Sequence, residues 1–449
     1  MERDISTRLI EWRQRPRRKP LILRGARQVG KTYSLLAFGQ HHFPTFHYVN
    51  FERDERLAAL FVADLNPMRI LRELSFYFDR AITAETDLLI FDEIQQCPQA
   101  LTSLKYFQEE IPQLAVCAAG SLLGVELGDG SFPVGKVELL NMFPLSLPEF
   151  LLGVGEERSY KFLRDLAAGD TIPEIVHSRL WSLLKTYMAV GGLPEAVKTY
   201  GDLQDDPYAA FQAVRKVQSD LITTYVADMA KHSGKINSMH LERLWANVPA
   251  QLAREQDGSA SKFKVKDVIP DIRGYERLAN VIDWLEKAGL IIKVKIVNSG
   301  KFPFAAHTKE NFFKLYCFDT GLLGALGNLP VKAILNYDFG TYKGYMAENF
   351  VAQEFMCAEA GELYSWQEAT AEVEFLREVE GEILPIEVKS GWVTQAKSLK
   401  VFAQKYNPSF RTIMSGKNLF LDTTNQIHHY PLYLACHFPL PATVSPDRN

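Results

Sequence analysis

The chain has 449 residues, a formal net charge of −4 and an isoelectric point near 6.2. Hydrophobic residues make up 47% of it and charged residues only 23%, which excludes an intrinsically disordered chain and allows large buried cores. The length predicts about three domains. The near-neutral charge excludes a surface that is basic throughout, although a local basic patch for nucleic acid stays compatible with it.

Cysteine usage and hydropathy bear on the compartment. The five cysteines show no CxxC spacing, so we expect neither a zinc site nor a disulfide framework, and a reducing compartment. The first 20 residues lack the apolar core of a signal peptide, and no apolar run reaches the roughly 18 residues of a membrane span. We therefore expect a cytoplasmic protein that does not engage a membrane.

The first motif lies in residues 21–38, LILRGARQVGKTYSLLAF, which predict a buried strand, a loop with Gly25-x-x-x-x-Gly30-Lys31-Thr32, and a helix. Glycines let the backbone wrap around a phosphate, and the loop amides point at the anion. Lys31 would bind the β and γ phosphates of ATP, and the Thr32 hydroxyl would ligate Mg²⁺. The alternative is an ordinary glycine-rich turn. The predicted nucleotide-binding residues are Gly25, Ala26, Arg27, Gln28, Val29, Gly30, Lys31, Thr32 and Tyr33.

A second strand is predicted in DLLIFDEIQQCP, residues 87–98, where four apolar residues precede Asp92 and Glu93. The carboxyl end of such a strand borders the ligand crevice of an open α/β sheet. Asp92 would hold Mg²⁺ through water, and Glu93 would polarise the water that attacks the γ phosphate. The alternative reading is a solvated acidic turn.

A third apolar strand, LAVCAAGS at 114–121, ends at Ser121. Its hydroxyl is placed like a polar sensor of the γ phosphate, and a simple turn explains it equally well. Together, Lys31, Glu93 and Ser121 are the predicted catalytic residues.

Four segments together resemble a known family: GARQVGKT, LLIFDEIQ, AAGS and NMFPLSLPEFL at 141–151. They are similar to prokaryotic AAA-type and STAND-like P-loop ATPases followed by a domain of unknown function with a nuclease-like end. The resemblance implies a helical lid after the ATPase sheet. Within GGLPEAV at 191–197, Gly192 and Pro194 match the lid element that touches the nucleotide, so Pro194 is an expected adenine contact. A helix stop at this Gly-Gly-x-Pro break is the alternative.

Residues 240–298 predict two helices, a polar break between them and the strand LIIKVKIV, an order that suggests a winged helix. Leu278, Val281, Ile282 and Leu285 would form the buried face of the second helix, and Gly289 would end it. The opposite face mixes basic and acidic side chains, whereas phosphate contacts need an excess of positive charge. DNA and a protein partner both remain open as ligands of this module.

Residues 371–391, AEVEFLREVEGEILPIEVKSG, predict a β-hairpin that turns near Glu380 and Gly381. In that register Glu374 faces Glu387, and a sheltered pair of carboxylates requires a cation such as Mg²⁺. Lys389 would orient a water or steady a phosphate. The arrangement resembles the PD-(D/E)xK nuclease core, with Glu374 in place of the usual Asp. The resemblance adds Glu348 on a leading helix at 341–356; a charged solvent face is the alternative.

Overall, the sequence predicts an α/β protein with a P-loop parallel sheet and a helical lid, then a winged helix and a PD-(D/E)xK-like domain. The expected domains are 1–150 for the ATPase core, 151–235 for the lid and connector, 236–304 for the winged helix and 305–449 for the nuclease-like part. The expected function is a Mg²⁺-dependent ATP-hydrolysing switch. An ATP-gated DNA nuclease and a nucleotide-binding adaptor without turnover are the alternatives, and the oligomeric state is left open.

Overall fold

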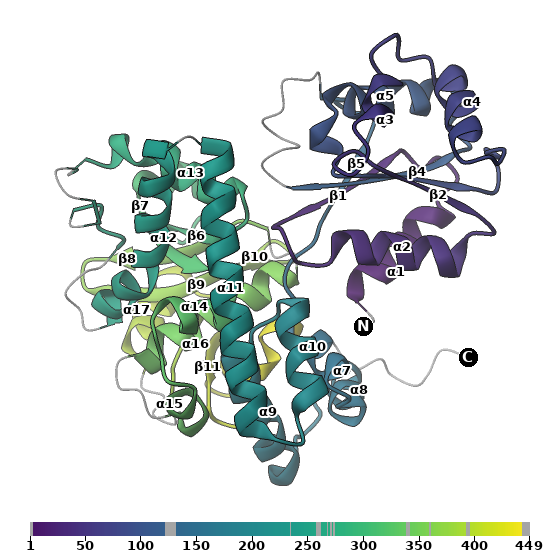
Figure 1. Ribbon diagram of the computed structural model, residues 1–449. Helices are drawn as coiled ribbons and strands as arrows, with labels where there is room; N and C mark the ends of the chain where they lie inside the picture. Colours follow the sequence, from purple (N-terminus) through teal and green to yellow (C-terminus); the bar gives the residue numbers. More distant parts are fainter. Residues whose placement is uncertain are drawn as a thin grey trace. The chain divides into compact units, whose positions relative to one another are not determined.

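The computed structural model describes most of the chain (Figure 1). The described residues are 3–121, 132–233, 235–256, 262–266, 268–269, 272, 274–337, 342–358, 361–391 and 396–441. They fall into two compact units: Met1–Phe143 with Lys287–Gly289, and Pro144–Glu286 with Leu290–Asn449. None of the helices in the described ranges combines the length and apolar character that a membrane crossing requires.

The first unit is built on a five-stranded, fully parallel sheet in the order β2-β3-β4-β1-β5. Its strands are β1 Leu21–Gly25, β2 Phe46–Asn50, β3 Leu88–Asp92, β4 Ala115–Ser121 and β5 Glu138–Asn141. Its α-helices are α1 Asp4–Gln14, α2 Lys31–His42, α3 Arg56–Ala59, α4 Pro67–Tyr77 and α5 Pro98–Glu110. Helices α1 and α2 cover one face of the sheet and α3 to α5 the other (Figure 1). The predicted P-loop parallel sheet is thus present.

Burial explains why the central strands of this sheet read as continuous apolar runs. All five residues of β3 are buried, as are the first six of β4. A strand covered by helices on both faces has no solvated side, so every position is apolar. The polar residues Asp92 and Ser121 then appear only where these strands end, at the same edge of the sheet.

The second unit begins with helices. They are α7 Leu147–Gly153, α8 Glu157–Asp165, α9 Glu174–Val190, α10 Pro194–Leu203, α11 Pro207–Ser233, α12 Lys235–Gln256 and α13 Ala279–Lys287. The predicted buried face of α13 is confirmed, since Leu278, Val281, Ile282 and Leu285 are all buried. Gly289 follows with a left-handed φ of 73°, as expected of a residue that ends a helix.

An eight-stranded mixed sheet forms the core of the rest of this unit, in the order β12-β13-β11-β10-β9-β8-β6-β7. The strands are β6 Ile291–Val297, β7 Thr308–Cys317, β8 Leu363–Glu368, β9 Ala371–Val379, β10 Glu382–Val388, β11 Arg411–Ser415, β12 Phe420–Asp422 and β13 Ile427–Pro431. The helices among them are α14 Thr320–Leu326, α15 Val331–Asn336, α16 Tyr342–Cys357 and α17 Lys397–Tyr406. The antiparallel pair β6–β7 therefore continues the same sheet as the C-terminal strands.

The hairpin predicted at 371–391 is confirmed together with its register. Strands β9 and β10 are antiparallel, and their residue pairs run from Val379 opposite Glu382 to Phe375 opposite Ile386. Glu380 and Gly381 both adopt positive φ at the turn, at 51° and 84°. Two central residues with positive φ match the right-handed twist of the flanking strands, which is why a local pattern could fix this pairing.

Candidate functional site

The loop between β1 and α2 has the backbone of a phosphate cradle. Gln28 and Gly30 both adopt left-handed φ values, 63° and 99°, which turn successive amides toward one side. The backbone of Gly25 lies close to Met142, the residue that follows β5. A Cβ on Gly25 would fall 2.1 Å from the carbonyl oxygen of Met142. Glycine is therefore required at this position by close approach of the backbone.

Lys31 lies inside this loop. The residue is buried, and its Nζ donates hydrogen bonds to the carbonyl oxygens of Gly25 at 3.0 Å and Ala26 at 2.7 Å. Burial lowers the pKa of Lys31 to about 8, against the charges of Glu93 and Asp92, which raise it. The Lys31 amine is thus bound by two neutral carbonyl oxygens of the loop, and a phosphate oxygen could replace them as acceptor.

The structure brings together Thr32 and Asp92, the two residues that the sequence analysis expects to hold Mg²⁺. The Thr32 hydroxyl lies 3.1 Å from both carboxylate oxygens of Asp92. Asp92 is buried at the end of β3, while Thr32 stands in the first turn of α2. A hydroxyl and a carboxylate in contact supply the oxygen donors that Mg²⁺ prefers.

Two further residues of this site were missed by the sequence reading. Tyr48 donates its hydroxyl to Asp92 Oδ2 at 2.6 Å, and Asn50 Nδ2 donates to the same oxygen at 3.2 Å. Burial and the hydrogen bond to Asp92 raise the pKa of Tyr48 to about 12. Both lie on β2, where Asn50 pairs with Asp92. The available signal was the polar Asn50 at the carboxyl end of a short strand that the sequence analysis did not predict.

Glu93 and Ser121 complete the edge of the sheet. Glu93 has a left-handed φ of 51°, an uncommon conformation for a residue other than glycine, and its carboxylate accepts a hydrogen bond from Gln95 Nε2. Ser121 pairs with Gly25 in the ladder between β4 and β1, so it lies beside the start of the loop. Uncommon backbone at a site of this kind is typical of functional residues.

The remaining predicted contacts differ in their surroundings. Val29 is buried, Arg27 half-buried, and Gln28 and Tyr33 are exposed. Pro194 lies in the second unit, where it opens α10. Just before it, the amide of Gly192 donates to the buried carboxylate of Asp319 at 2.6 Å, which accounts for the break between α9 and α10. A nucleotide contact by Pro194 stays a prediction.

A second group of ionisable side chains lies where β9 and β10 run beside α16. Lys389 Nζ is 2.5 Å from Glu387 Oε1 and 3.9 Å from Glu374 Oε1. The Val388 amide donates to Glu374 Oε2 at 3.3 Å. Glu387 is buried, and its Oε2 has no hydrogen-bond partner among the described residues. Burial and the charge of Glu387 raise the pKa of Glu374 well above its usual value, against the lowering effect of Lys389.

Four more residues join this group, two from strand β7, one from helix α16 and one from strand β9. We call the whole group the glutamate cluster: Glu348, Glu372, Glu374, Glu387, Lys314, Lys389 and Tyr316. Tyr316 donates its hydroxyl to Glu348 Oε2 at 2.7 Å, and Lys314 Nζ lies 3.7 Å from that oxygen. The same amine is 2.5 Å from Glu372 Oε1. Lys314, Tyr316 and their bonds to the two glutamates were not anticipated from the sequence.

The two lysines of the glutamate cluster compensate the negative charge of its glutamates. Lys389 now bridges the two carboxylates between which the sequence placed a metal ion. Within the described ranges, no set of three or more His, Cys, Asp or Glu side chains is arranged to hold a metal. An ion at Glu374 and Glu387 therefore requires Lys389 to turn aside, and Glu387 Oε2 is the acceptor already available to it.

Comparison with protein families assigns the class of the first unit. Residues 17–151 match the model of an AAA domain, residues 182–333 match a domain of unknown function (DUF8612), and residues 343–433 match another (DUF4143). The loop and acidic strand described above lie within the first match. The chain thus carries an AAA-type P-loop ATPase domain, followed by a part that matches domains of unknown function. Domains of this class bind and hydrolyse nucleoside triphosphates.

Solved structures add similarities of fold alone. The Walker-type ATPase PABY2304 of Pyrococcus abyssi is 16% identical with a TM-score of 0.43, over 73% of this chain and 95% of that one. The Aeropyrum pernix ORC1 protein in complex with DNA is 14% identical, with a TM-score of 0.30, over 74% and 92%. The Thermotoga maritima RuvB branch migration motor is 12% identical, with a TM-score of 0.30, over 64% and 86%. A comparison with curated proteins finds no match.

Proposed function

We propose that this protein is a Mg²⁺-dependent ATPase that works as a switch. ATP binds in the loop between Gly25 and Thr32, with Lys31 on its β and γ phosphates. The observation that carries the proposal is the contact of the Thr32 hydroxyl with Asp92. In the adjoining loop, Lys31 is bound by backbone carbonyl oxygens, which the phosphates of ATP would replace. Arg27, Val29 and Tyr33 take further contacts with the nucleotide.

The chain's own residues would hold the metal and position the water. Thr32 and Asp92 present the oxygen donors, and Tyr48 and Asn50 fix the Asp92 carboxylate from the adjacent strand. Mg²⁺ bound there would neutralise charge on the β and γ phosphates. Glu93 accepts the proton of the attacking water as general base. Ser121 senses the γ phosphate at the neighbouring strand end.

The switch would couple nucleotide state to the C-terminal half. In this proposal residues 1–150 are the ATPase core, 151–235 the helical lid with Pro194 as an adenine contact, 236–304 a winged helix and 305–449 a nuclease-like domain. Binding and release of the γ phosphate would change how these later domains are presented to a DNA or protein partner. The order of helices α12 and α13 followed by strand β6 supports a winged-helix interpretation.

ATP turnover by the purified chain, with and without DNA, tests this function. We expect Lys31→Ala to lose ATP binding, and Glu93→Gln to keep binding but lose turnover by at least about a hundredfold. Lys105→Ala and Glu110→Gln, both on α5, are the matched controls and should keep full turnover. Turnover of Glu93→Gln equal to that of the parent would reject the hydrolysis mechanism. Binding without turnover in the parent would favour the adaptor.

A second candidate function, Mg²⁺-dependent cleavage of DNA, is favoured by the glutamate cluster. Glu348 from the helix and Glu374 and Glu387 from the hairpin are close enough for their charges to act on one another. We propose that Glu374 and Glu387 ligate Mg²⁺, with Glu348 beside them, once Lys389 turns to a scissile phosphate. The buried Glu387 Oε2, which lacks a hydrogen bond among the described residues, supports this assignment.

Cleavage of plasmid and single-stranded DNA with Mg²⁺ and ATP tests the second candidate. We expect Lys389→Ala to abolish cleavage while ATP turnover survives. Lys400→Ala, an exposed lysine on α17, is the control and should cut like the parent. Cleavage by Lys389→Ala at the parental rate would reject the nuclease assignment without touching the ATPase.

A further inference from the structure

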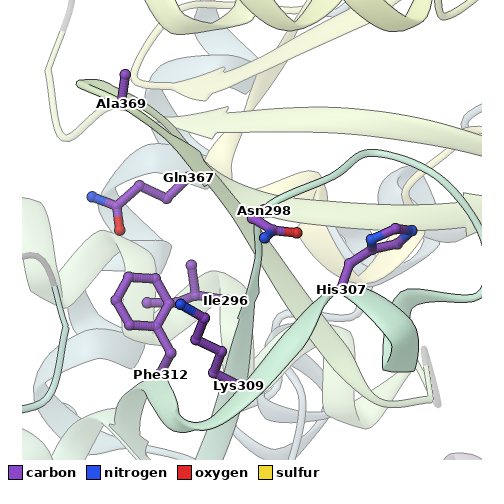
Figure 2. A pocket seen from close by; sticks show the side chains of 7 residues that line it. All are labelled: Ile296, Asn298, His307, Lys309, Phe312, Gln367 and Ala369. Carbon is purple, nitrogen blue, oxygen red and sulfur yellow. The ribbon is translucent and has the colours of Figure 1, made fainter.

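A pocket of about 290 Å³ opens beside the β6–β7 hairpin in the second unit (Figure 2). Its lining residue Gln367 pairs with Glu372 of the glutamate cluster across strands β8 and β9. Its principal lining residues are Ile296, Asn298, His307, Lys309, Phe312 and Gln367. They come from β6 and the segment after it, from β7 and the short helix before it, and from β8. Small-molecule pockets typically measure about 300–1,000 Å³, so this one has room for a single small ring system.

The walls combine a flat apolar surface with amide groups. Figure 2 shows the Phe312 ring close to Ile296, with the Gln367 amide above it and Asn298 on the opposite side of the space. Oε1 of Gln367 is buried and has no hydrogen-bond partner among the described residues. Each amide side chain offers both a donor and an acceptor. A planar heteroaromatic ring with polar edges is the chemistry that an aromatic wall and two amides complement.

The rim of the pocket is positively charged. Lys309 is exposed at the start of β7, and Lys262 Nζ lies 4.6 Å from the centroid of the Phe312 ring. Burial, and then the charge of Lys309, lower the pKa of Lys262, so the two ammonium groups are near neighbours. An anion between two like charges would relieve this repulsion.

Two acidic groups on the strands beside the pocket are paired with lysines outside its rim. Glu372, opposite Gln367 in the ladder between β8 and β9, lies 2.5 Å from Lys314 Nζ. Glu368 on β8 is paired with Lys405, whose Nζ lies 2.6 Å from both of its carboxylate oxygens. Glu310 follows Lys309 along β7 and is exposed to solvent, which screens its charge. The Glu310 charge acts on Tyr275, whose pKa it helps to raise after burial and Asp283.

We infer that this pocket binds one nucleotide of a single-stranded nucleic acid, with its base against Phe312 and its phosphates on Lys309 and Lys262. The base edge meets Asn298 and Gln367. Stacking on an aromatic side chain beside a basic rim is how proteins hold single strands without reading a duplex. In a duplex the base edges and faces are already stacked and paired, so an unpaired base is required. An acidic peptide would use the lysines but leave the ring and both amides without a partner.

Fluorescence anisotropy of the full-length protein with labelled oligonucleotides of about 20 nucleotides tests the pocket. The probes are oligo-dT, oligo-rU and an abasic deoxyribose-phosphate strand of equal length. We expect the abasic strand and the Phe312→Ala variant each to bind roughly tenfold more weakly than oligo-dT binds the parent. The ratio of oligo-dT to oligo-rU affinity tells which sugar is preferred.

Lys309→Gln provides a variant that cannot disturb the core, because this side chain is exposed. We expect it to weaken binding of oligo-dT and to lower the slope of log affinity against log salt by about 0.7, the value for one phosphate of a single strand. Lys301→Gln, exposed on the same connection but outside the pocket, should leave that slope unchanged. ATP turnover and melting temperature, measured on every variant, separate a local loss from misfolding.

Three results would overturn the assignment. The first is equal affinity of the parent for oligo-dT and the abasic strand. The second is unchanged binding by Lys309→Gln and by a folded Phe312→Ala. The third is binding of poly-glutamate that depends on Phe312 as strongly as oligo-dT binding does, which would make the ligand an acidic peptide. All three are independent of whether Lys31→Ala abolishes ATP turnover.

Discussion

The two acidic sites of this chain differ in what surrounds their carboxylates. Asp92 in the first unit receives neutral donors from Thr32, Tyr48 and Asn50. Glu374 and Glu387 in the second unit share the ammonium group of Lys389. Neutral donors orient a carboxylate but leave its charge for an incoming cation, whereas a lysine cancels the charge in advance. These surroundings support the metal–nucleotide site proposed for the first unit, whereas in the second unit a lysine already compensates the carboxylates.

Removal of Lys389 should have the largest effect of the tests that follow, because it takes away the cation that distinguishes the second acidic site from the first. Lys389→Met leaves two carboxylates, both largely buried, without their cation, and we expect it to lower the free energy of unfolding by about 3–4 kcal/mol. Urea denaturation measures the loss. The double variant Lys389→Met with Glu387→Gln should recover part of it, because one charge is then absent.

An exposed lysine pair gives the control for this experiment. Lys405 and Glu368 form an ion pair at the surface, where solvent screens the interaction, so Lys405→Met should cause no measurable change in the urea midpoint. If both lysine variants unfold like the parent, the glutamate cluster is solvated in solution. In that case the charge compensation inferred for Glu374 and Glu387 is wrong.

A third site, the buried carboxylate of Asp319, sharpens the comparison, because its hydrogen bonds come from backbone amides. Asp319 accepts hydrogen bonds from the amides of Gly192 and Leu322, yet burial outweighs them and raises its pKa from 3.8 to about 6. The folded state then keeps this proton up to about pH 6, while the unfolded state releases it near 3.8. Stability contributed by the protonated carboxyl is therefore present at low pH and lost as pH rises.

The expected size of this effect follows from the shift. Between about pH 4 and pH 6.5, the unfolding free energy of the parent should fall by about 2 kcal/mol more than that of Asp319→Asn. Urea titrations of both proteins at several pH values measure the difference. Parallel pH profiles would mean that the amides of Gly192 and Leu322 compensate the buried charge fully.

Local sequence determined the parts that were predicted. The phosphate loop occupies eight consecutive residues, so its strand, turn and helix could be recognised without knowing the rest of the fold. The register between β9 and β10 followed from a two-residue turn and one alternating apolar set, and the observed pairs agree with it. In both regions the local structure is defined by residues close in sequence, such as Lys31 with Gly25 and Ala26 in the loop.

The missed residues depend on the order of strands in a sheet. Tyr48 reaches Asp92 because β2 lies next to β3, and a sequence does not state which strands are neighbours. Lys314 and Tyr316 join the glutamate cluster from β7, at the far end of the sheet order, through the bonds they make with Glu348 and Glu372. The resemblance of motifs supplied Glu348, whereas no local pattern supplied its partners.

The smallest expected effect concerns Tyr48. Its replacement tests whether a neutral hydrogen-bond donor to Asp92 contributes to ATP turnover. Tyr48→Phe removes one hydrogen bond to a carboxylate, and we expect ATP turnover to fall five- to tenfold, or about 1–1.4 kcal/mol. Steady-state phosphate release measures it. Tyr77→Phe removes a hydroxyl that donates to Asp54 at 3.1 Å near the surface, and turnover should then match the parent. If Tyr48→Phe also matches the parent, Thr32 and Asn50 suffice to orient Asp92, and the tyrosine serves packing alone.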